Sequence, residues 1–139
     1  EQVQERMDII ICRLSLDTNS IEFSSALHKM VLIRNGEATF FGGCRHFIGS
    51  QFKKGFKFIE HKLLLKTDDQ IFMFSDGVYD QKGGDKGKKL YFKGFEEFLI
   101  QMANIPVSEQ ENYLSSKIKS WQGGAEQLDD MLVFGWKVQ

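Results

Sequence analysis

Ile71-Phe72-Met73-Phe74-Ser75-Asp76-Gly77 is an apolar run that ends on a carboxylate and a glycine. Near the C-terminus, Asp129-Asp130 leads into a second apolar run, Met131-Leu132-Val133-Phe134. An ionised carboxylate beside a buried strand is costly unless a cation or several donors meet it. Either motif alone is most often a turn, because Gly tolerates positive φ and Asp caps its own backbone. Taken together, two carboxylates at the ends of two hydrophobic strands are able to hold a divalent metal.

The composition predicts one folded domain over residues 1–139. Hydrophobic residues make up 42% of the chain, and the net charge is −1, which gives no general attraction to nucleic acid or to an anionic membrane. No apolar stretch approaches the roughly 20 residues that span a bilayer, and no signal-peptide pattern opens the chain. We therefore expect a cytoplasmic protein, or the cytoplasmic part of a larger sensor protein, without membrane insertion.

The two cysteines, Cys12 and Cys44, lie in no CxxC motif and have no histidine spaced for zinc. They are able to pair, but a buried free thiol in a reducing cytosol is the simpler interpretation.

Alternation and turn residues predict strands in the first half of the chain. Residues 8–16 alternate at period two and return through residues 21–24 after a polar turn. Asn35-Gly36 predicts a tight hairpin between residues 30–34 and 37–41. Residues 58–65 and 70–74 are expected to form a further strand pair.

Helical spacing follows in the second half. One apolar stripe consists of Phe95, Phe98, Leu99 and Met102. The next helix is expected to begin with Ser108 as N-cap and Glu111 completing a capping box, and to end at Gly123-Gly124. Its predicted buried face consists of Leu114, Ile118 and Trp121. With a last strand over 131–138, the pattern predicts an α+β fold.

Residues 74–89, Glu109-Gln110, Trp121-Gln122-Gly123 and 126–131 form an ordered series of motifs. In order and spacing they resemble the C-terminal half of SpoIIE-like phosphatases, which belong to the metal-dependent PPM, or type-2C, serine/threonine phosphatases. The resemblance runs from Met7-Asp8-Ile9 to the end of the chain.

This resemblance implies an antiparallel β-sandwich flanked by helices, with manganese or magnesium ions at the strand ends. Carried over by motif, Asp76 and Asp129 are the expected metal ligands, and Asp130 has a lesser, supporting role. Two or more ions are expected in a complete domain, where a metal-activated water hydrolyses phosphoserine or phosphothreonine. The expected substrate is a phosphorylated regulatory protein, of which an anti-anti-sigma-like protein is one example, in bacterial signalling.

Two departures separate this sequence from the family pattern. The family has a further Asp-Gly well upstream, whereas only seven residues precede Asp8, so the domain is expected to be incomplete at the N-terminus. A polar residue followed by proline is usual where this chain has Leu27 and Lys29, and His28 is the one candidate substitute. The chain alone is therefore expected to be weak or inactive as an enzyme. A non-catalytic, PPM-like binding domain is the alternative.

A lysine-rich segment, residues 82–89, raises a third possibility, phosphate-loop or nucleic-acid chemistry. Its spacing does not match a GxxxxGK[ST] loop, so a solvated loop is expected, with docking of an acidic phosphoprotein as the next interpretation. The phenylalanines are expected to fill the core and interfaces: Phe40, Phe41, Phe47, Phe52, Phe56 and Phe58. Apolar surface left by a partial domain is expected to favour self-association.

Overall fold

The computed structural model of the chain describes residues 6–49, 51 and 54–139. Within these residues the strands are β1 (Ile9–Ser15), β2 (Ser20–Ala26), β3 (Lys29–Arg34), β4 (Glu37–Gly42), β5 (Glu60–Leu64), β6 (Gln70–Phe74), β7 (Lys82–Gly83), β8 (Lys88–Lys89) and β9 (Val133–Lys137). The helices are α1 (Gly77–Asp80), α2 (Tyr91–Ala103) and α3 (Val107–Gln122). None of the helices in this part of the chain is long and apolar enough to cross a membrane.

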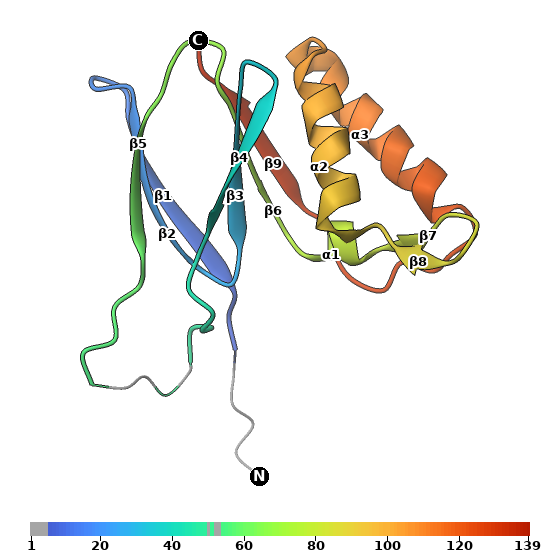
Figure 1. Cartoon of the computed structure of the whole chain (residues 1–139), viewed down its shortest axis with the longest axis horizontal. Helices are drawn as coiled ribbons and strands as arrows, with labels where there is room; N and C mark the ends of the chain where they lie inside the picture. Colours follow the sequence, from blue (N-terminus) through green and yellow to red (C-terminus); the bar gives the residue numbers. More distant parts are fainter. Residues whose placement is uncertain (1–5, 50, 52–53) are drawn as a thin grey trace.

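Two antiparallel sheets and a layer of helices lie side by side (Figure 1). One sheet has the strand order β1-β2-β5, and the other has the order β4-β3-β6-β9. Helices α2 and α3 cover the outer face of the second sheet. The predicted α+β architecture, an antiparallel sandwich flanked by helices, is confirmed.

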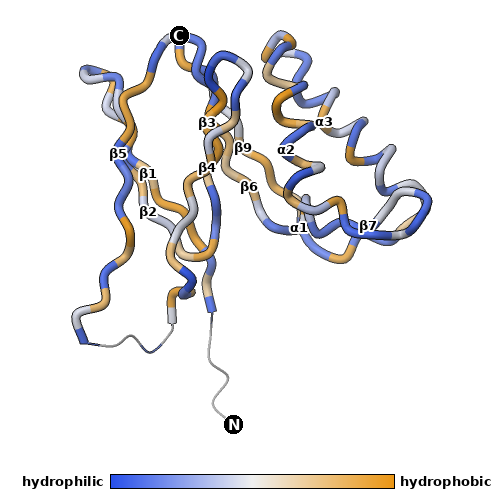
Figure 2. The backbone as a smooth tube through the Cα atoms, viewed as in Figure 1, coloured by the Kyte–Doolittle hydropathy of each residue, from blue (hydrophilic) through white to orange (hydrophobic). Residues whose placement is uncertain are grey.

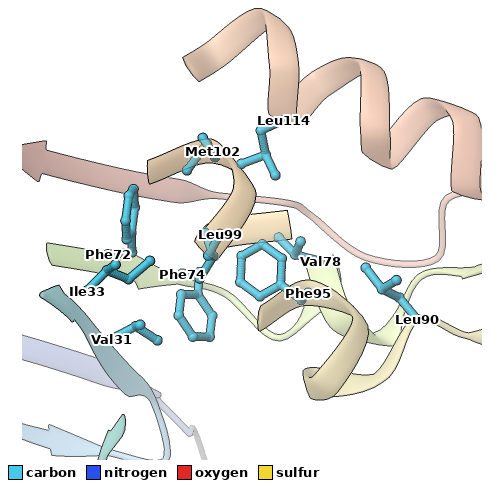
Figure 3. Packing of buried hydrophobic residues seen from close by; sticks show 10 residues of the cluster. All are labelled: Val31, Ile33, Phe72, Phe74, Val78, Leu90, Phe95, Leu99, Met102 and Leu114. Atoms are coloured by element: carbon cyan, nitrogen blue, oxygen red, sulfur yellow. The ribbon is translucent and has the colours of Figure 1, made fainter. Parts of the chain in front are cut away.

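Strand β3 explains how the layers are held together, because it is buried on both faces. Alternate residues of a strand point to opposite faces. Val31 and Ile33 therefore join the cluster beneath the helices, which contains Phe72, Phe74, Val78, Leu90, Phe95, Leu99, Met102 and Leu114 (Figure 3). Met30 and Leu32 join the cluster between the sheets, which contains Ile21, Phe23, Leu65, Ile71 and Val138.

Local turn chemistry fixed the β3–β4 hairpin as expected. Asn35 and Gly36 have φ angles of 52° and 78°, and Arg34 pairs with Glu37 across the turn. The β1–β2 hairpin is also confirmed, with Ser15 paired to Ser20. Figure 2 shows hydrophobic residues along the strands and hydrophilic residues in the turns that join them.

The expected pairing of residues 58–65 with 70–74 is wrong. Both segments contain strands, but β5 pairs with β2, whereas β6 pairs with β3 and β9. The connection crosses from one sheet to the other, and Asp69 fixes the crossing by accepting hydrogen bonds from Arg34 and from the backbone N–H of Lys66. Backbone bonds join the same connection to Val138, which holds β9 beside β6.

The apolar stripe of α2 is confirmed, since Phe95, Leu99 and Met102 are buried. The predicted start of α3 is wrong, because Pro106 is the N-cap and no side chain caps the helix. Pro106 is extended, with ψ of 140°, and its carbonyl accepts the N–H of Glu109, so Ser108 lies inside the first turn. Gly123 ends the helix at φ 55°, as expected.

Cys44 is buried and Cys12 is exposed, and both are free thiols. The expectation of burial is therefore wrong for Cys12. The reason is that β1 is an edge strand, so the face that carries Cys12 and Leu14 is only partly covered, and Leu14 is 37% exposed. At the edge of the other sheet, Phe134 on β9 is 54% exposed. Apolar side chains thus reach solvent at both of these edge strands.

The prediction that phenylalanines fill the core is confirmed for Phe40 and Phe41. Phe40 and Phe41 pack against the two buried clusters. Phe47, Phe56 and Phe58 are half-buried. Phe52 lies outside the described residues.

Candidate functional site

The candidate site lies where β6 ends and β9 begins. These strands are antiparallel neighbours, with Phe74 paired to Val133, so the residue after β6 and the residues before β9 meet at one end of the sheet. We call this the site end. Asp76 is the second residue after β6, and Asp129 and Asp130 lie a few residues before β9. The two motifs singled out in the sequence are therefore brought to the same place.

Ser75 continues the strand pairing up to the two motifs. Its backbone N–H donates to Leu132 O at 3.0 Å. Its hydroxyl donates to Asp130 O at 2.9 Å and accepts the N–H of Leu132 at 2.9 Å. These bonds fix the 130–132 segment against the end of β6.

Gly77 allows the two segments to approach each other closely. A Cβ at this position would lie 2.3 Å from Asp130 O and 3.3 Å from Asp129 Cβ. Real Cβ atoms are never found so near a backbone oxygen, so any larger residue would push the segments apart. The glycine of the Asp-Gly motif is thus required by its close contact with the Asp130 backbone. It is not a turn residue, because it begins the helix α1.

Asp76 and Asp129 present exposed carboxylates. Asp76 occupies the N-cap position of α1, yet its side chain caps no backbone group. Asp129 accepts the N–H of Asp130 on Oδ1 at 2.8 Å. In the described part of the chain, neither carboxylate forms an ion pair.

Carboxylate oxygens are the donors that Mn²⁺ and Mg²⁺ prefer, and ions of this kind keep several waters when only one or two carboxylates bind them. The residues at the site therefore suit one such ion. Across the described residues, no three His, Cys, Asp or Glu side chains gather into a metal-binding group. The prediction that Asp76 and Asp129 are metal ligands therefore stays a prediction, with their two segments at one end of the sheet.

A second group of residues at the site end was not found from the sequence. Lys29 begins β3, and its Nζ lies 4.4 Å from the ring centroid of Phe92 and 5.9 Å from that of Tyr79. Burial raises the pKa of Tyr79, and the carboxylates of Asp76, Asp80 and Asp8 raise it further. The signal available in the sequence was the position of Tyr79, three residues after Asp76.

The β2–β3 corner carries the residues that depart from the family pattern. Leu27 adopts a left-handed φ of 67°, which is strained for a residue with a branched side chain. The backbone of His28 is tied to Ala26 and Gly43, and its carbonyl accepts the Ser25 hydroxyl at 2.7 Å. Its imidazole forms no hydrogen bond with the described residues, so a ligand role for His28 stays a prediction.

The lysine-rich segment, expected to be a solvated loop, forms the small β7–β8 hairpin with Lys82 paired to Lys89. It packs on the end of α3, where Gly84 N–H donates to Trp121 O at 2.7 Å. Lys89 forms an ion pair with Asp80 at 2.9 Å. These contacts describe an ordered hairpin and not a phosphate-cradling loop.

Comparison with known proteins places this geometry in a family. The sequence model described as "Stage II sporulation protein E (SpoIIE)" matches residues 3–139. Among curated proteins, none matches the chain.

Three solved structures have the same fold. The SiaA-PP2C domain of Pseudomonas aeruginosa superposes with a TM-score of 0.87 at 21% identity, over 96% of this chain and 52% of that one. The manganese-presoaked phosphatase domain of SpoIIE from Bacillus subtilis gives 0.70 at 15% identity, over 94% and 56%. The serine/threonine phosphatase PstP/Ppp of Mycobacterium tuberculosis gives 0.59 at 15% identity, over 91% and 57%.

The chain thus spans about half the length of the phosphatase structures that it matches. The likeness covers the sandwich, the helices and both aspartate segments. The chain therefore belongs to the SpoIIE family and has the fold of PP2C-type phosphatase domains.

Proposed function

We propose that this chain is the metal-binding C-terminal part of a protein phosphatase domain that hydrolyses phosphoserine or phosphothreonine. The observation that carries the proposal is the close approach of Gly77 to Asp129 and Asp130, which brings two unpaired carboxylates to one strand end. Membership in a phosphatase family supports it.

In this proposal Asp76 and Asp129 bind Mn²⁺ or Mg²⁺ through carboxylate oxygens. A bound ion of this kind lowers the pKa of a water and polarises a phosphoryl oxygen. The chain's own residues hold that centre in place: Ser75 fixes the segment that carries Asp130, and Gly77 sets its distance from α1. Asp130 contributes through its backbone carbonyl, which accepts the Ser75 hydroxyl.

The substrate in this proposal is a phosphorylated regulatory protein. No nucleophilic side chain is required, because a metal ion held by Asp76 and Asp129 would supply an activated water as the nucleophile. Two carboxylates are too few for a complete two-ion site, so further ligands must come from outside the residues described here. The exposed Leu14 and Phe134 favour association with another polypeptide, including a second copy of the chain.

A non-catalytic binding domain is the alternative function. The observation that favours it is Leu27, which brings an apolar, exposed side chain to the corner where the family usually has a polar residue. Retention of both Asp76 and Asp129 argues against it.

Calorimetric titration with Mn²⁺ separates the two functions. We expect the chain to bind Mn²⁺ and Asp76→Ala to abolish that binding, while Asp85→Ala, which removes an exposed carboxylate on the β7–β8 hairpin, leaves it unchanged. The phosphatase proposal fails if Mn²⁺ does not bind, or if Asp76→Ala binds it as well as the unmodified chain.

A further inference from the structure

Lys29 is a cation at the site end that no part of the proposed function uses. It is the first residue of β3 and pairs with Gly42, and the next residue, Met30, pairs with Met73 on β6. Its Nζ lies above the ring of Phe92, with Tyr79 also within cation–π range. The position of Lys29 is therefore fixed both by the sheet and by two aromatic faces.

The charge of Lys29 is not neutralised by a carboxylate among the described residues, in contrast to three other lysines of the chain. Lys62, Lys89 and Lys137 each form an ion pair with a carboxylate. Lys29 forms no such pair with any described residue, and the rings that hold it are neutral. An ammonium group held this way keeps its hydrogen-bond donors for a partner outside the chain.

The surroundings of Lys29 indicate the kind of partner. Tyr79, beneath the ammonium group, lies three residues after Asp76 on the single turn of α1. The carboxylate of Asp80 is already paired with Lys89. An ion held by Asp76 and an ammonium group on the neighbouring strand would present two positive centres to one ligand, which suits the several oxygens of a phosphoryl group.

We propose that Lys29 is a phosphate-binding residue, whose ammonium group donates to the phosphoryl oxygens of the substrate. The proposal rests on the proposed function, in which Asp76 and Asp129 hold the metal. It makes Lys29 a specificity-determining residue for a dianionic phosphoryl group at the site end. The competing interpretation is that Lys29 only stabilises the packing of Phe92 and Tyr79.

The test compares Lys29→Met with Lys29→Arg and with Lys86→Met, which removes an exposed charge on the β7–β8 hairpin. Methionine keeps an apolar stem over the two rings and removes the charge. The ligands are inorganic phosphate, titrated at saturating Mn²⁺, and Mn²⁺ alone. Unfolding by urea is followed in parallel.

We expect Lys29→Met to weaken phosphate binding about tenfold, the typical effect of removing one charged hydrogen bond. Mn²⁺ affinity should stay the same or rise, because a repelling positive charge is removed. Lys86→Met should bind phosphate within about twofold of the unmodified chain. Lys29→Arg, which keeps a positive charge and hydrogen-bond donors, should bind phosphate more tightly than Lys29→Met.

Unchanged phosphate affinity in Lys29→Met overturns the proposal. A parallel loss of phosphate affinity, Mn²⁺ affinity and stability also overturns it, because that pattern is expected of a residue that only stabilises packing. If the unmodified chain binds no Mn²⁺, the proposed function fails by that result alone. Phosphate titration in metal-free buffer then decides on Lys29: equal affinity of the chain and of Lys29→Met overturns the inference, and weaker binding by the variant supports it.

Discussion

An aspartate lies close to each end of strand β6, and the two carboxylates differ in their burial and in their partners. Asp69, just before the strand, is 1% exposed and accepts hydrogen bonds from Arg34 at 2.8 and 2.6 Å and from the backbone N–H of Lys66 at 2.7 Å. Asp76, two residues after the strand, is exposed, its side chain makes no capping hydrogen bond at the start of α1, and it has no ion-pair partner among the described residues. The carboxylate before β6 thus has its partners inside the protein, whereas the carboxylate after β6 has no ion-pair partner among the described residues.

The difference separates a structural carboxylate from one available to a ligand. A buried charge without partners would cost several kcal/mol, so the chain supplies Asp69 with a guanidinium and a backbone donor. Ser75 and Gly77 also position the segments that carry Asp76 and Asp129, but these contacts are made to the backbone and Cβ atoms of the segments and not to the carboxylates. The backbone of the two segments is held in place, and neither carboxylate forms an ion pair with a described residue.

The largest expected effect comes from the removal of the buried carboxylate of Asp69. Asp69→Ala leaves Arg34 without its buried partner and removes the bond to Lys66 N–H, so we expect a loss of roughly 3 kcal/mol in the free energy of unfolding. Urea denaturation measures it. Asp68→Asn, which removes the exposed charge paired with Lys137 and keeps a side chain that tolerates the left-handed φ of 72°, is the matched control and should cost less than about 0.5 kcal/mol. Equal losses in the two variants would contradict the comparison.

The same contrast predicts a pH dependence. Burial raises the pKa of Asp69, but the hydrogen bonds from Arg34 and Lys66 outweigh it, so the pKa lies below its ordinary value in the folded protein. Stability from Asp69 is therefore complete above the ordinary aspartate pKa of about 4 and is lost as the pH falls through the lower, folded-state pKa. In Asp69→Asn this part of the acid sensitivity should disappear.

Gly77→Ala tests how the site end is closed. The added Cβ would lie 2.3 Å from Asp130 O, so the two aspartate segments must separate. We expect about 2 kcal/mol of destabilisation and a loss of Mn²⁺ affinity greater than the stability loss explains. Gly124→Ala, where a Cβ meets nothing within 4 Å, provides the control. Retention of full Mn²⁺ affinity by Gly77→Ala would show that the close approach is not needed.

Ser75→Ala is expected to have a smaller effect. It removes one hydroxyl that donates to Asp130 O and accepts from Leu132 N–H, while the backbone bond from Ser75 N to Leu132 O remains. Stability should fall by about 1 kcal/mol, and Mn²⁺ affinity should fall with it, because the Asp129 segment becomes looser. Thr at this position keeps the hydroxyl and should restore both quantities, and failure of that rescue would count against the role assigned to Ser75.

The smallest effect concerns backbone strain. Both ends of the second sheet have a left-handed residue nearby, Asp68 at φ 72° and Leu27 at φ 67°. Aspartate tolerates this conformation and leucine does not. Leu27→Gly should therefore stabilise the chain by about 0.5 kcal/mol, after the entropic cost of glycine is subtracted. A thermal shift measures it, and a lower midpoint than that of Leu27→Ala would contradict the assignment of strain.

Much of the fold was predictable from local patterns. Asn35-Gly36 determines its hairpin because the turn itself requires both positive φ angles, and the α2 stripe follows from helical periodicity. The pairing of β5 with β2 was not predictable, because no local signal says which sheet a strand joins when its connection crosses the core. The exposure of Cys12 was missed for a related reason, since alternation cannot tell an edge strand from a central one.

Some residues of the candidate site could likewise be predicted from the sequence, and others could not. Asp76 and Asp129 were predicted as metal ligands from the resemblance of their motifs to a phosphatase family, and antiparallel pairing brings their segments together. Lys29, Tyr79 and Asp8 could not be grouped from the sequence, because β3, α1 and the residue before β1 come together only after the sheets and α1 have packed. The contact of Gly77 with Asp130 is likewise a tertiary one.

The most direct measurement of the central claim is a double-mutant cycle on Mn²⁺ affinity with Asp76→Asn and Asp129→Asn. If both carboxylates bind one ion, each single variant should lose at least about tenfold in affinity, and the double variant should lose little more than either. Losses that simply add, or a single variant that binds Mn²⁺ like the unmodified chain, would show that the two aspartates do not share a metal and would contradict the account.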